Sequence, residues 1–496
     1  MRAILKKHPF LTIVISATLV YFFSWFFAWK IGVNDLPIQS EDTLPAIFMP
    51  VTILKEGTIY LDSYYDMLLS RYPHPDDKSY EKGLVPFYLR EVISDSRNDT
   101  HYVSAFTIIT PLLALPVYFL PVLLGVSINW TNLIVLSHLA ASFIVALSGG
   151  FLYLLLRKHF FSQDSGKTFF KQKSLLLTAI YLFATINFAH ISQALWQHGT
   201  VQLFTILALW AIYEKRYPLT GLFFGLMILS RPTSAIPVTL LGLAALTNLF
   251  NTSPSSQVEA SERKTENTSF KRTFADRYCG RNVSLKDGVL SLIALSLGFL
   301  PTLIFFLWYN KTYYGNISNQ GYSNQIFTEW KGRFPEGFLG LWISPSKGIL
   351  IYSPIFIFSL AGLYLAVKNR KQNLNCIILG LIVLIHTLVL GKWKHWYGGW
   401  SFGYRMASDV IPFLILLMVP FIKSSHFQKA KNLFFILFGL SIFVQFFGIV
   451  FYDGTWHSAY DLGYENTSWL WSLKNSELIF NIRRVLVKTG LRATPF

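Results

Sequence analysis

The sequence predicts an all-α, polytopic membrane protein with a large first extracytoplasmic loop that carries juxtamembrane helices. We expect about 11 transmembrane helices, within a range of about 9 to 13. Composition is the first reason: 52% of the 496 residues are hydrophobic and 14% are charged, whereas soluble proteins carry about 25% charged residues. The second is that apolar runs of bilayer length, about 20 residues, recur along the chain, as at 11–29, 288–309 and 433–452.

Lysine and arginine gather in short connectors between the apolar runs. The clearest clusters are Arg2, Lys6 and Lys7; Arg157, Lys158, Lys167, Lys171 and Lys173; Lys215 and Arg216; Lys368, Arg370 and Lys371; and Lys423, Lys429 and Lys431. Basic connectors of this kind face the cytoplasm, so the net charge of +17 does not indicate a nucleic-acid partner. We expect a cytoplasmic N-terminus and an extracytoplasmic tail from Asp453. The first apolar run reads as a retained span rather than a cleaved signal peptide.

The acidic residues mark the first loop. Of the 26 Asp and Glu residues, 12 lie between Lys30 and Tyr102. The next apolar run, 106–126, contains Pro111, Pro116 and Pro121. If it crossed the membrane, every later basic connector would lie outside. We therefore predict that 106–126 is re-entrant or interfacial, which is tolerated where protein covers the broken helix.

The chain divides into two membrane modules. Residues 1–250 form the N-terminal module, which includes the first loop at 30–105, and residues 288–496 form the C-terminal module with a short extracytoplasmic tail. The connector between them, 251–287, is polar and rich in Ser, Thr and charge, as expected of a cytoplasmic linker loop. The only two cysteines, Cys279 and Cys376, argue against a disulfide scaffold.

Polar residues concentrate at one end of the predicted topology. Five unusual stretches fall on the outer side: residues 39–46, 189–199, 229–234, 308–348 and 391–405. Arg231 interrupts a long apolar stretch, where an arginine costs roughly 2.5–3.5 kcal/mol and is functional by default; the alternative is that it reaches the interface as an anchor. This one-sidedness predicts an extracytoplasmic site that is reached from the lipid.

The segment "GKWKHWYGGWSFGYR", residues 391–405, is the most informative of the five. It combines three tryptophans and four glycines with two lysines, a histidine and an arginine. An aromatic belt at the interface explains the tryptophans but not the interleaved cations. Glycine permits close approach of the backbone to a ligand, and arginine forks match phosphate oxygens. The segment therefore suits an anionic lipid headgroup that carries a sugar.

Several motifs together resemble a known superfamily. The stretch "WYGGWSFGYRMASDVIP" (396–412) resembles a "W-W-G-G-W-S-x-G-P-R…D…P" motif of bacterial GT-C glycosyltransferases, which are similar to protein O-mannosyltransferases and aminoarabinose transferases. The stretches "SEDTLPAIFMPVTILKEGTIYLD", "ALWQHG", "LMILSRPT", "WYNKTYYGN…GY" and "GLWISPSKGILIYSPI" resemble further pieces in the same order. The resemblance covers roughly residues 30–415 and departs from the motif at Tyr404, where many relatives have proline.

The resemblance implies a transferase that moves a sugar from a polyprenyl-phosphate carrier to an extracytoplasmic acceptor. Asp42 would be the general base on the acceptor hydroxyl. Arg231, Lys347 and Arg405 would hold the donor phosphate. The residues implied to line the sugar and acceptor cleft are Glu41, Trp196, His198, Tyr322, His395, Trp396 and Trp400. The first loop has no Asp-x-Asp, so a divalent metal is possible but not indicated, and no other cofactor is expected.

Two other classes remain open. An O-antigen-ligase-like enzyme would use the same donor but carry its large outer loop late in the chain. A transporter or flippase of lipid-linked glycans would show paired broken helices in two related halves. The sequence leaves the sugar and the acceptor open, whether lipid, glycan or protein. The expected location is the plasma (inner) membrane of a bacterium, with the active site on the extracytoplasmic face.

Overall fold

The protein is a bundle of helices with one small hairpin. The computed structural model describes residues 8–34, 40–79, 81–93, 99–161, 167–246, 285–317, 328–370 and 373–495. Helix accounts for 72% of the described residues and strand for 2%, which confirms the predicted all-α class. The candidate residue Tyr322 and nearly all of the predicted linker 251–287 lie outside the described residues.

The elements follow one another along the described chain. Those of the first half are α2 (Pro9–Lys30), η1 (Glu41–Thr43), α3 (Leu44–Glu56), η2 (Asp62–Tyr64), α4 (Tyr65–Leu69), β1 (Leu89–Ile93), β2 (Thr100–Ser104), α5 (Ile109–Leu123), α6 (Trp130–Leu155), η3 (Leu156–Phe160), α7 (Lys167–Phe183), α8 (Ile186–Ala189), η4 (Ile191–Gln193), α9 (Gln197–Tyr213), α10 (Tyr217–Ser230), η5 (Pro232–Ser234) and α11 (Ala235–Leu246). Those of the second half are α14 (Leu285–Tyr314), α16 (Glu336–Ile343), α17 (Ile349–Tyr352), η7 (Pro354–Phe356), α18 (Ile357–Lys368), α19 (Leu374–Leu390), η8 (Arg405–Val410), α20 (Ile411–Leu417), α21 (Val419–Lys423), α22 (Ser425–Lys429), α23 (Lys431–Phe451), α24 (Thr455–Tyr460), η9 (Thr467–Trp471) and α25 (Glu477–Lys488).

Judged by length and composition, fewer helices qualify as membrane spans than the sequence predicts. Among the described residues, 5 helices are long and apolar enough to cross a membrane, or 6 if a pair bent by 46° at residues 172–193 forms one span. The other predicted spans fall on shorter helices, of which α10, α11, α18 and α19 are apolar. A membrane protein is therefore supported, while the count of about 11 stays a prediction.

Helix α14 shows how a lipid-facing helix is held. Only 6% of its most apolar window is buried, so most of its leucine and isoleucine side chains face outward. It packs on α10 through glycines: a side chain added at Gly221, Gly225 or Gly298 would collide with the facing helix. Small residues at a contact let two backbones approach closely, which is how helices associate where lipid removes the hydrophobic drive between them.

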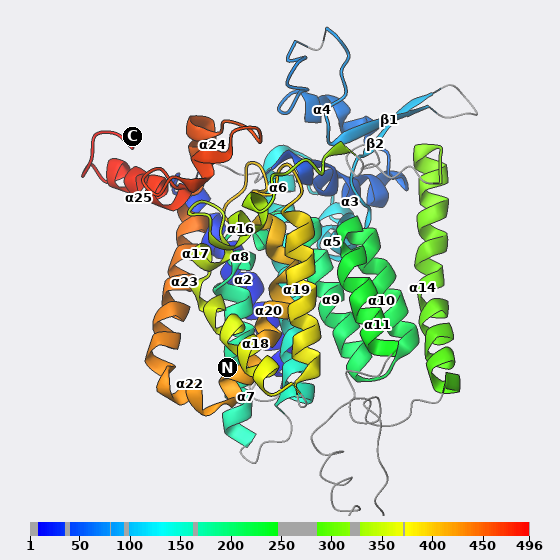
Figure 1. The fold of residues 1–496 in the computed structure, drawn as a ribbon. Helices are drawn as coiled ribbons and strands as arrows, with labels where there is room; N and C mark the ends of the chain where they lie inside the picture. Colours follow the sequence, from blue (N-terminus) through cyan, green and yellow to red (C-terminus); the bar gives the residue numbers. More distant parts are fainter. Residues whose placement is uncertain are drawn as a thin grey trace, which may run out of the picture.

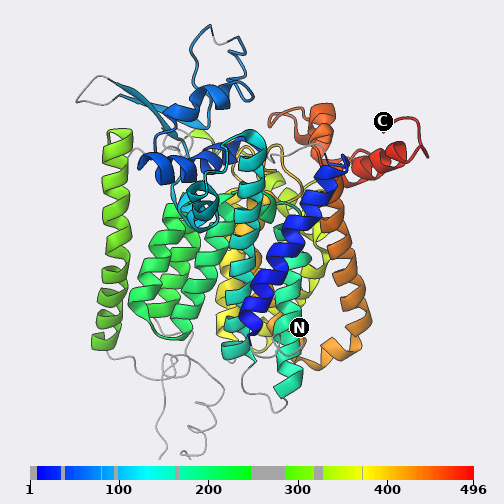
Figure 2. The ribbon, with the colours of Figure 1, turned by 180° about the vertical axis from the view of Figure 1, so that it is seen from behind.

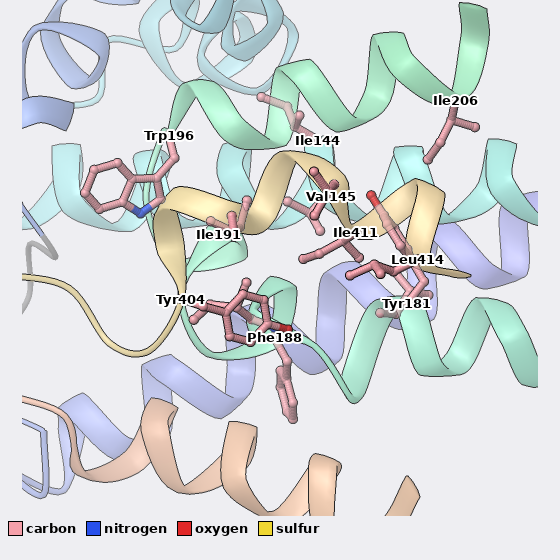
Figure 3. Close-up of a cluster of buried hydrophobic side chains, with 14 of the residues drawn as sticks. Ile144, Val145, Tyr181, Phe188, Ile191, Trp196, Ile206, Tyr404, Ile411 and Leu414 are labelled. Carbon is pink, nitrogen blue, oxygen red and sulfur yellow. The ribbon is translucent and has the colours of Figure 1, made fainter. Parts of the chain in front are cut away.

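The two predicted modules share a continuous core. Buried side chains from α6, α7, η4 and α9 meet those of α20 (Figure 3). Hydrogen bonds also cross between the halves: the Asn34 amide donates to the Ile449 carbonyl at 2.7 Å, and the Tyr404 hydroxyl accepts from the Ile186 N–H at 3.1 Å. Packing between the two halves of the chain therefore holds the residues that flank the candidate site described below.

The two ends of the bundle differ. The N-terminus lies near one end together with α22, whereas α3, α4, the β1–β2 hairpin, α24 and α25 lie at the other (Figure 1). The strands pair antiparallel, from Leu89 opposite Ser104 to Ile93 opposite Thr100. Helix α5 has only 15 residues, with Pro116 and Pro121 inside it, and is seen nearly end-on beside α3 in Figure 2. It therefore runs across the bundle rather than along it, while its re-entrant or interfacial placement in the membrane stays a prediction.

Candidate functional site

The segment 391–405 forms a turned loop that needs its glycines. Gly398, Gly399 and Gly403 have φ angles of +85°, +61° and +59°, a region that side-chain-bearing residues rarely adopt. A Cβ at Gly403 would also lie 2.8 Å from the ring of Tyr352. These turns aim the Gly398 carbonyl back at Arg405, which donates to it from Nη2 at 2.6 Å.

Arg405 joins the predicted base to the predicted aromatic wall. Its Nη1 donates to a carboxylate oxygen of Asp42 at 2.9 Å, although the two residues are 363 positions apart in sequence. The guanidinium carbon lies 4.3 Å from the ring centroid of Trp196, in cation–π range. Asp42 is positioned by η1, where Ser40 caps the turn by accepting from the Asp42 N–H. The two residues that the resemblance gives the central roles are therefore in direct contact.

A second charged cluster, which is more deeply buried, lies beside the Asp42–Arg405 pair. Arg231 is the first residue after α10, and its Nη1 donates to Asp409 Oδ2 at 2.7 Å. His198, at the start of α9, lies with Nδ1 2.8 Å from Asp409 Oδ1. Asp409 is buried in η8. One carboxylate therefore holds an arginine and a histidine that come from two different helices.

These residues surround a cavity of about 420 Å³. Six of the predicted site residues line it, namely Asp42, Trp196, His198, Arg231, His395 and Arg405. Further lining comes from Phe87, Ser104, Phe106, Thr107, Thr110, Gln197, Trp330, Leu390, Trp393 and Met406, among others. The lining combines two arginines and one carboxylate with several aromatic side chains. Such a surface fits a ligand with an anionic group and a ring that stacks on aromatic faces.

A paired backbone forms the aromatic wall of the cavity. The Lys394 N–H donates to the Glu329 carbonyl at 2.9 Å, and the Gly332 N–H donates to the Lys392 carbonyl at 2.8 Å. Trp330, Trp393 and His395 line this cavity, while Lys331, Lys394 and Trp396 line a neighbouring one of about 340 Å³.

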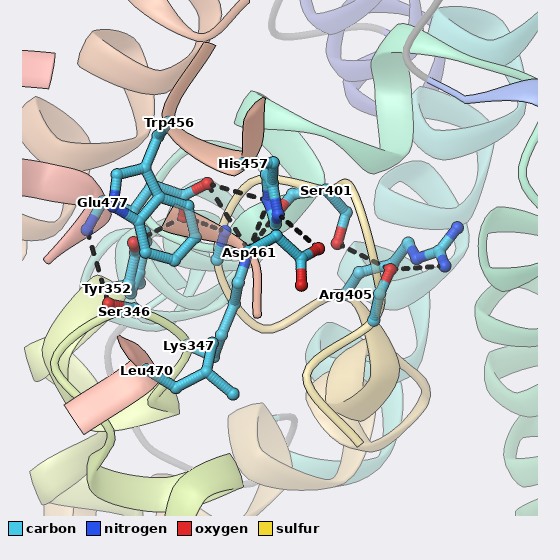
Figure 4. A network of polar contacts seen from close by, with 12 residues as sticks. Ser346, Lys347, Tyr352, Ser401, Arg405, Trp456, His457, Asp461, Leu470 and Glu477 are labelled. Atoms are coloured by element: carbon cyan, nitrogen blue, oxygen red, sulfur yellow. Dashed lines mark hydrogen bonds and ion pairs between the residues drawn. The ribbon is translucent and has the colours of Figure 1, made fainter. Parts of the chain in front are cut away.

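Lys347 does not line the cavity. Its ammonium is fully buried and contacts the Ser401 carbonyl, His457 Nε2 at 3.2 Å and Glu477 Oε1 at 3.4 Å (Figure 4). Glu477 also accepts from the Tyr352 hydroxyl at 2.7 Å. Burial lowers the pKa of Lys347, and the nearby Glu477 carboxylate opposes that shift. The geometry favours a structural ion pair that ties the 399–404 loop to α25.

We expect either Lys347→Met or Glu477→Gln to destabilise the fold by about 3–5 kcal/mol, because each leaves one buried charge uncompensated. The double variant should be more stable than either single variant. Thermal unfolding followed by tryptophan fluorescence, with undecaprenyl phosphate affinity measured alongside, checks both points. A Lys347→Met protein with unchanged melting temperature and weakened phosphate binding would return Lys347 to the phosphate-binding set.

The remaining predicted residues occupy different positions. His395 lines the cavity next to the Tyr397 hydroxyl, 3.1 Å from Nδ1, and burial lowers its pKa to about 4. Glu41 adjoins Asp42; burial and the Asp42 charge raise its pKa. Trp396 is buried against Gly340. Trp400 is 52% exposed and stacks on His457.

Sequence reasoning missed some residues in and around the cavity. Asp409 was not proposed for the site, although it stands inside the quoted motif at "SDVIP"; an acid just before an apolar run was the available signal. Trp330, Trp393 and the threonines near β2 were missed because only the paired backbone and the hairpin bring them to the cavity. Among the described residues, no group of three or more His, Cys, Asp or Glu side chains could hold a metal ion.

Compared with known proteins, the chain matches no protein-family model and no curated protein. The functional proposal therefore depends on the geometry of this cavity and on the motifs in the sequence.

Proposed function

We propose that the chain is an integral membrane glycosyltransferase of the GT-C type, which moves a sugar from a polyprenyl-phosphate donor to an acceptor hydroxyl. The observation that supports this most strongly is the convergence of Asp42, Arg231 and Arg405 on one aromatic-lined cavity. A base and two phosphate-binding cations are the groups that such a reaction requires. The cavity lies at the end of the bundle that carries the first loop, where a lipid headgroup would be found.

The reaction assigns one task to each group. The acceptor oxygen forms a bond to the anomeric carbon of the donor while the bond from that carbon to the phosphate oxygen breaks. The hydroxyl proton goes to the Asp42 carboxylate, and the electron pair of the broken bond leaves with the polyprenyl phosphate. Arg231 and Arg405 stabilise the charge that develops on this phosphate, a contribution that preorganised groups make efficiently in a site with little water.

The Asp42–Arg405 ion pair suggests the order of events. Arg405 uses Nη1 for Asp42 and Nη2 for the Gly398 carbonyl. A donor phosphate at Nη1 would displace the carboxylate and leave it available to the acceptor hydroxyl. Donor binding would then prepare the base.

The proposed setting is a bacterial plasma membrane with the cavity on the extracytoplasmic face and about 11 spans. The acceptor would be a lipid, glycan or protein outside the membrane. The opposite placement of the N-terminus and the first loop in the bundle (Figure 1) supports this orientation, as does the positive-inside pattern of the connectors.

Reporter fusions at Lys371 and Phe496 should report opposite sides of the membrane, with Lys371 inside. The reason is that the connector at 368–371 is basic while the tail after Asp453 lies with the first loop. Alkaline phosphatase and a cytoplasmic fluorescent reporter at both positions measure this directly. Equal signals at the two positions would contradict the proposed orientation.

Deletion of the gene, followed by mass spectrometry of cell-envelope glycans, lipids and proteins, tests the function. Loss of one sugar, restored by the wild-type chain and not by Asp42→Asn, supports a transferase. A lipid-linked sugar that accumulates on the cytoplasmic leaflet would indicate a flippase instead. Loss of a whole preassembled polymer would indicate a ligase-like enzyme.

A further inference from the structure

The buried carboxylate of Asp409 has more partners than a simple ion pair needs. Besides Arg231 at 2.7 Å and His198 at 2.8 Å, its Oδ2 lies 3.9 Å from Nε2 of His386. The Asp409 side chain is 2% exposed and that of His198 is 5% exposed. His198 of α9, Arg231 directly after α10 and His386 of α19 therefore surround one buried carboxylate, and two of them, His198 and Arg231, also line the cavity.

The contacts determine which ring nitrogen of His198 carries the proton. A second full positive charge beside Arg231 would leave one buried charge uncompensated, so the imidazole is neutral. Its Nδ1 lies 2.8 Å from the Asp409 carboxylate and 2.9 Å from Nη1 of Arg231, which can only donate. A bare Nδ1 could accept from Arg231 but would face a carboxylate oxygen lone pair to lone pair, so we assign the hydrogen to Nδ1, which donates it to Asp409 while Arg231 donates to Oδ2. Nε2 is left with its lone pair.

We propose that Asp409 is a positioning residue that fixes His198 as the Nδ1–H tautomer, so that Nε2 accepts a hydrogen bond from a sugar hydroxyl in the cavity. The same carboxylate holds the Arg231 guanidinium beside the donor phosphate. This role rests on the proposed function only for the identity of the ligand, because the tautomer is a property of the unliganded protein. A histidine whose orientation depends on a carboxylate is a recurring arrangement in catalytic and metal sites.

Asp409→Asn gives a clear chemical consequence. The guanidinium of Arg231 cannot accept a hydrogen bond, so the amide oxygen of the new side chain must face Arg231. The amide nitrogen then faces His198 and donates to Nδ1. The ring proton moves to Nε2, which changes from an acceptor to a donor toward the cavity.

Nitrogen-15 NMR of histidine-labelled protein in nanodiscs tests the tautomer. Comparison with His198→Ala assigns the resonances, because protonated and unprotonated ring nitrogens resonate far apart. We expect Nδ1–H in the wild type and Nε2–H in Asp409→Asn. A wild-type ring protonated on Nε2 would overturn the proposal, even if the Asn variant failed to fold.

Transfer kinetics test the consequence. Asp409→Asn should lower kcat by about 10- to 100-fold, the usual cost of losing a residue that orients a functional histidine. The variant combining it with His198→Ala should lose less than the product of the two single losses, because the residues act as a unit. Losses that multiply would contradict the proposal.

A matched control separates positioning from general stability. Asp453→Asn removes another aspartate–arginine pair, a partly buried one with Arg484, at the same end of the bundle (Figure 1). It should lower the melting temperature without changing the His198 tautomer or kcat. If the wild type transfers no sugar while the tautomer is as expected, the proposed function fails and the positioning of His198 stands.

Discussion

Asp42→Asn should lower sugar transfer by about 10²- to 10⁴-fold, the range that a positioned general base contributes. Asparagine keeps the shape of the side chain, and its amide oxygen still accepts from Arg405 Nη1, which is 2.9 Å from the carboxylate in the wild type. It cannot take the acceptor proton. The loss should therefore appear in kcat, with donor KM and melting temperature close to those of the wild type.

Asp66→Asn is the matched control, because Asp66 lies in the same loop at α4 and outside the cavity. It should retain wild-type turnover. Transfer by Asp42→Asn within a few-fold of the wild type would remove Asp42 as the base. Asp62, which instead pairs with His101 at 2.7 Å, would then be the next acid to test.

Arg405→Lys should weaken donor use by about 10- to 150-fold, which corresponds to the roughly 1.5–3 kcal/mol of a charge-assisted hydrogen bond. Arg405 makes three contacts at once, to Asp42, the Gly398 carbonyl and the face of Trp196. A lysine ammonium is a point charge without a fork and cannot keep all three. Arg405→Ala should lose more. Donor titrations of the three proteins measure the effect.

Melting temperature distinguishes a phosphate clamp from an interfacial anchor. Arg333→Lys serves as the control, because Arg333 is an exposed arginine at the same end that donates to the Glu465 carbonyl. It should bind donor normally. If Arg405→Lys and Arg405→Ala change stability but leave donor KM unchanged, Arg405 anchors the loop and does not bind phosphate.

The helical class could be predicted from the sequence because bilayer-length apolar runs and basic connectors are local signals. Part of the cavity could also be predicted: Arg231 and Arg405 are charged residues at unexpected positions, Asp42 was implied by the resemblance, and all three line the cavity. Lys347 looked similar in sequence, but its partner Glu477 lies 130 residues away. Sequence cannot distinguish a buried ion pair from a free cation when the partner is that distant.

Asp409, Trp330 and Trp393 were not placed at the site from sequence for a different reason. Their position depends on long-range packing: η8 against α9 and α19, and the backbone pair between 329–332 and 392–394. The number of spans was also hard to predict, because helices such as α10 and α18 are apolar but only 14 and 12 residues long. Hydropathy alone registers both as spans.

The most direct test of the donor site is a cryo-EM structure of the chain in nanodiscs with undecaprenyl phosphate. We predict phosphate density within about 3 Å of the Arg405 guanidinium, close to Arg231, with Asp42 separated from Arg405 and facing the cavity. Phosphate density elsewhere, or an empty cavity with the Asp42–Arg405 pair intact at saturating lipid, would contradict the assignment of this cavity to the donor.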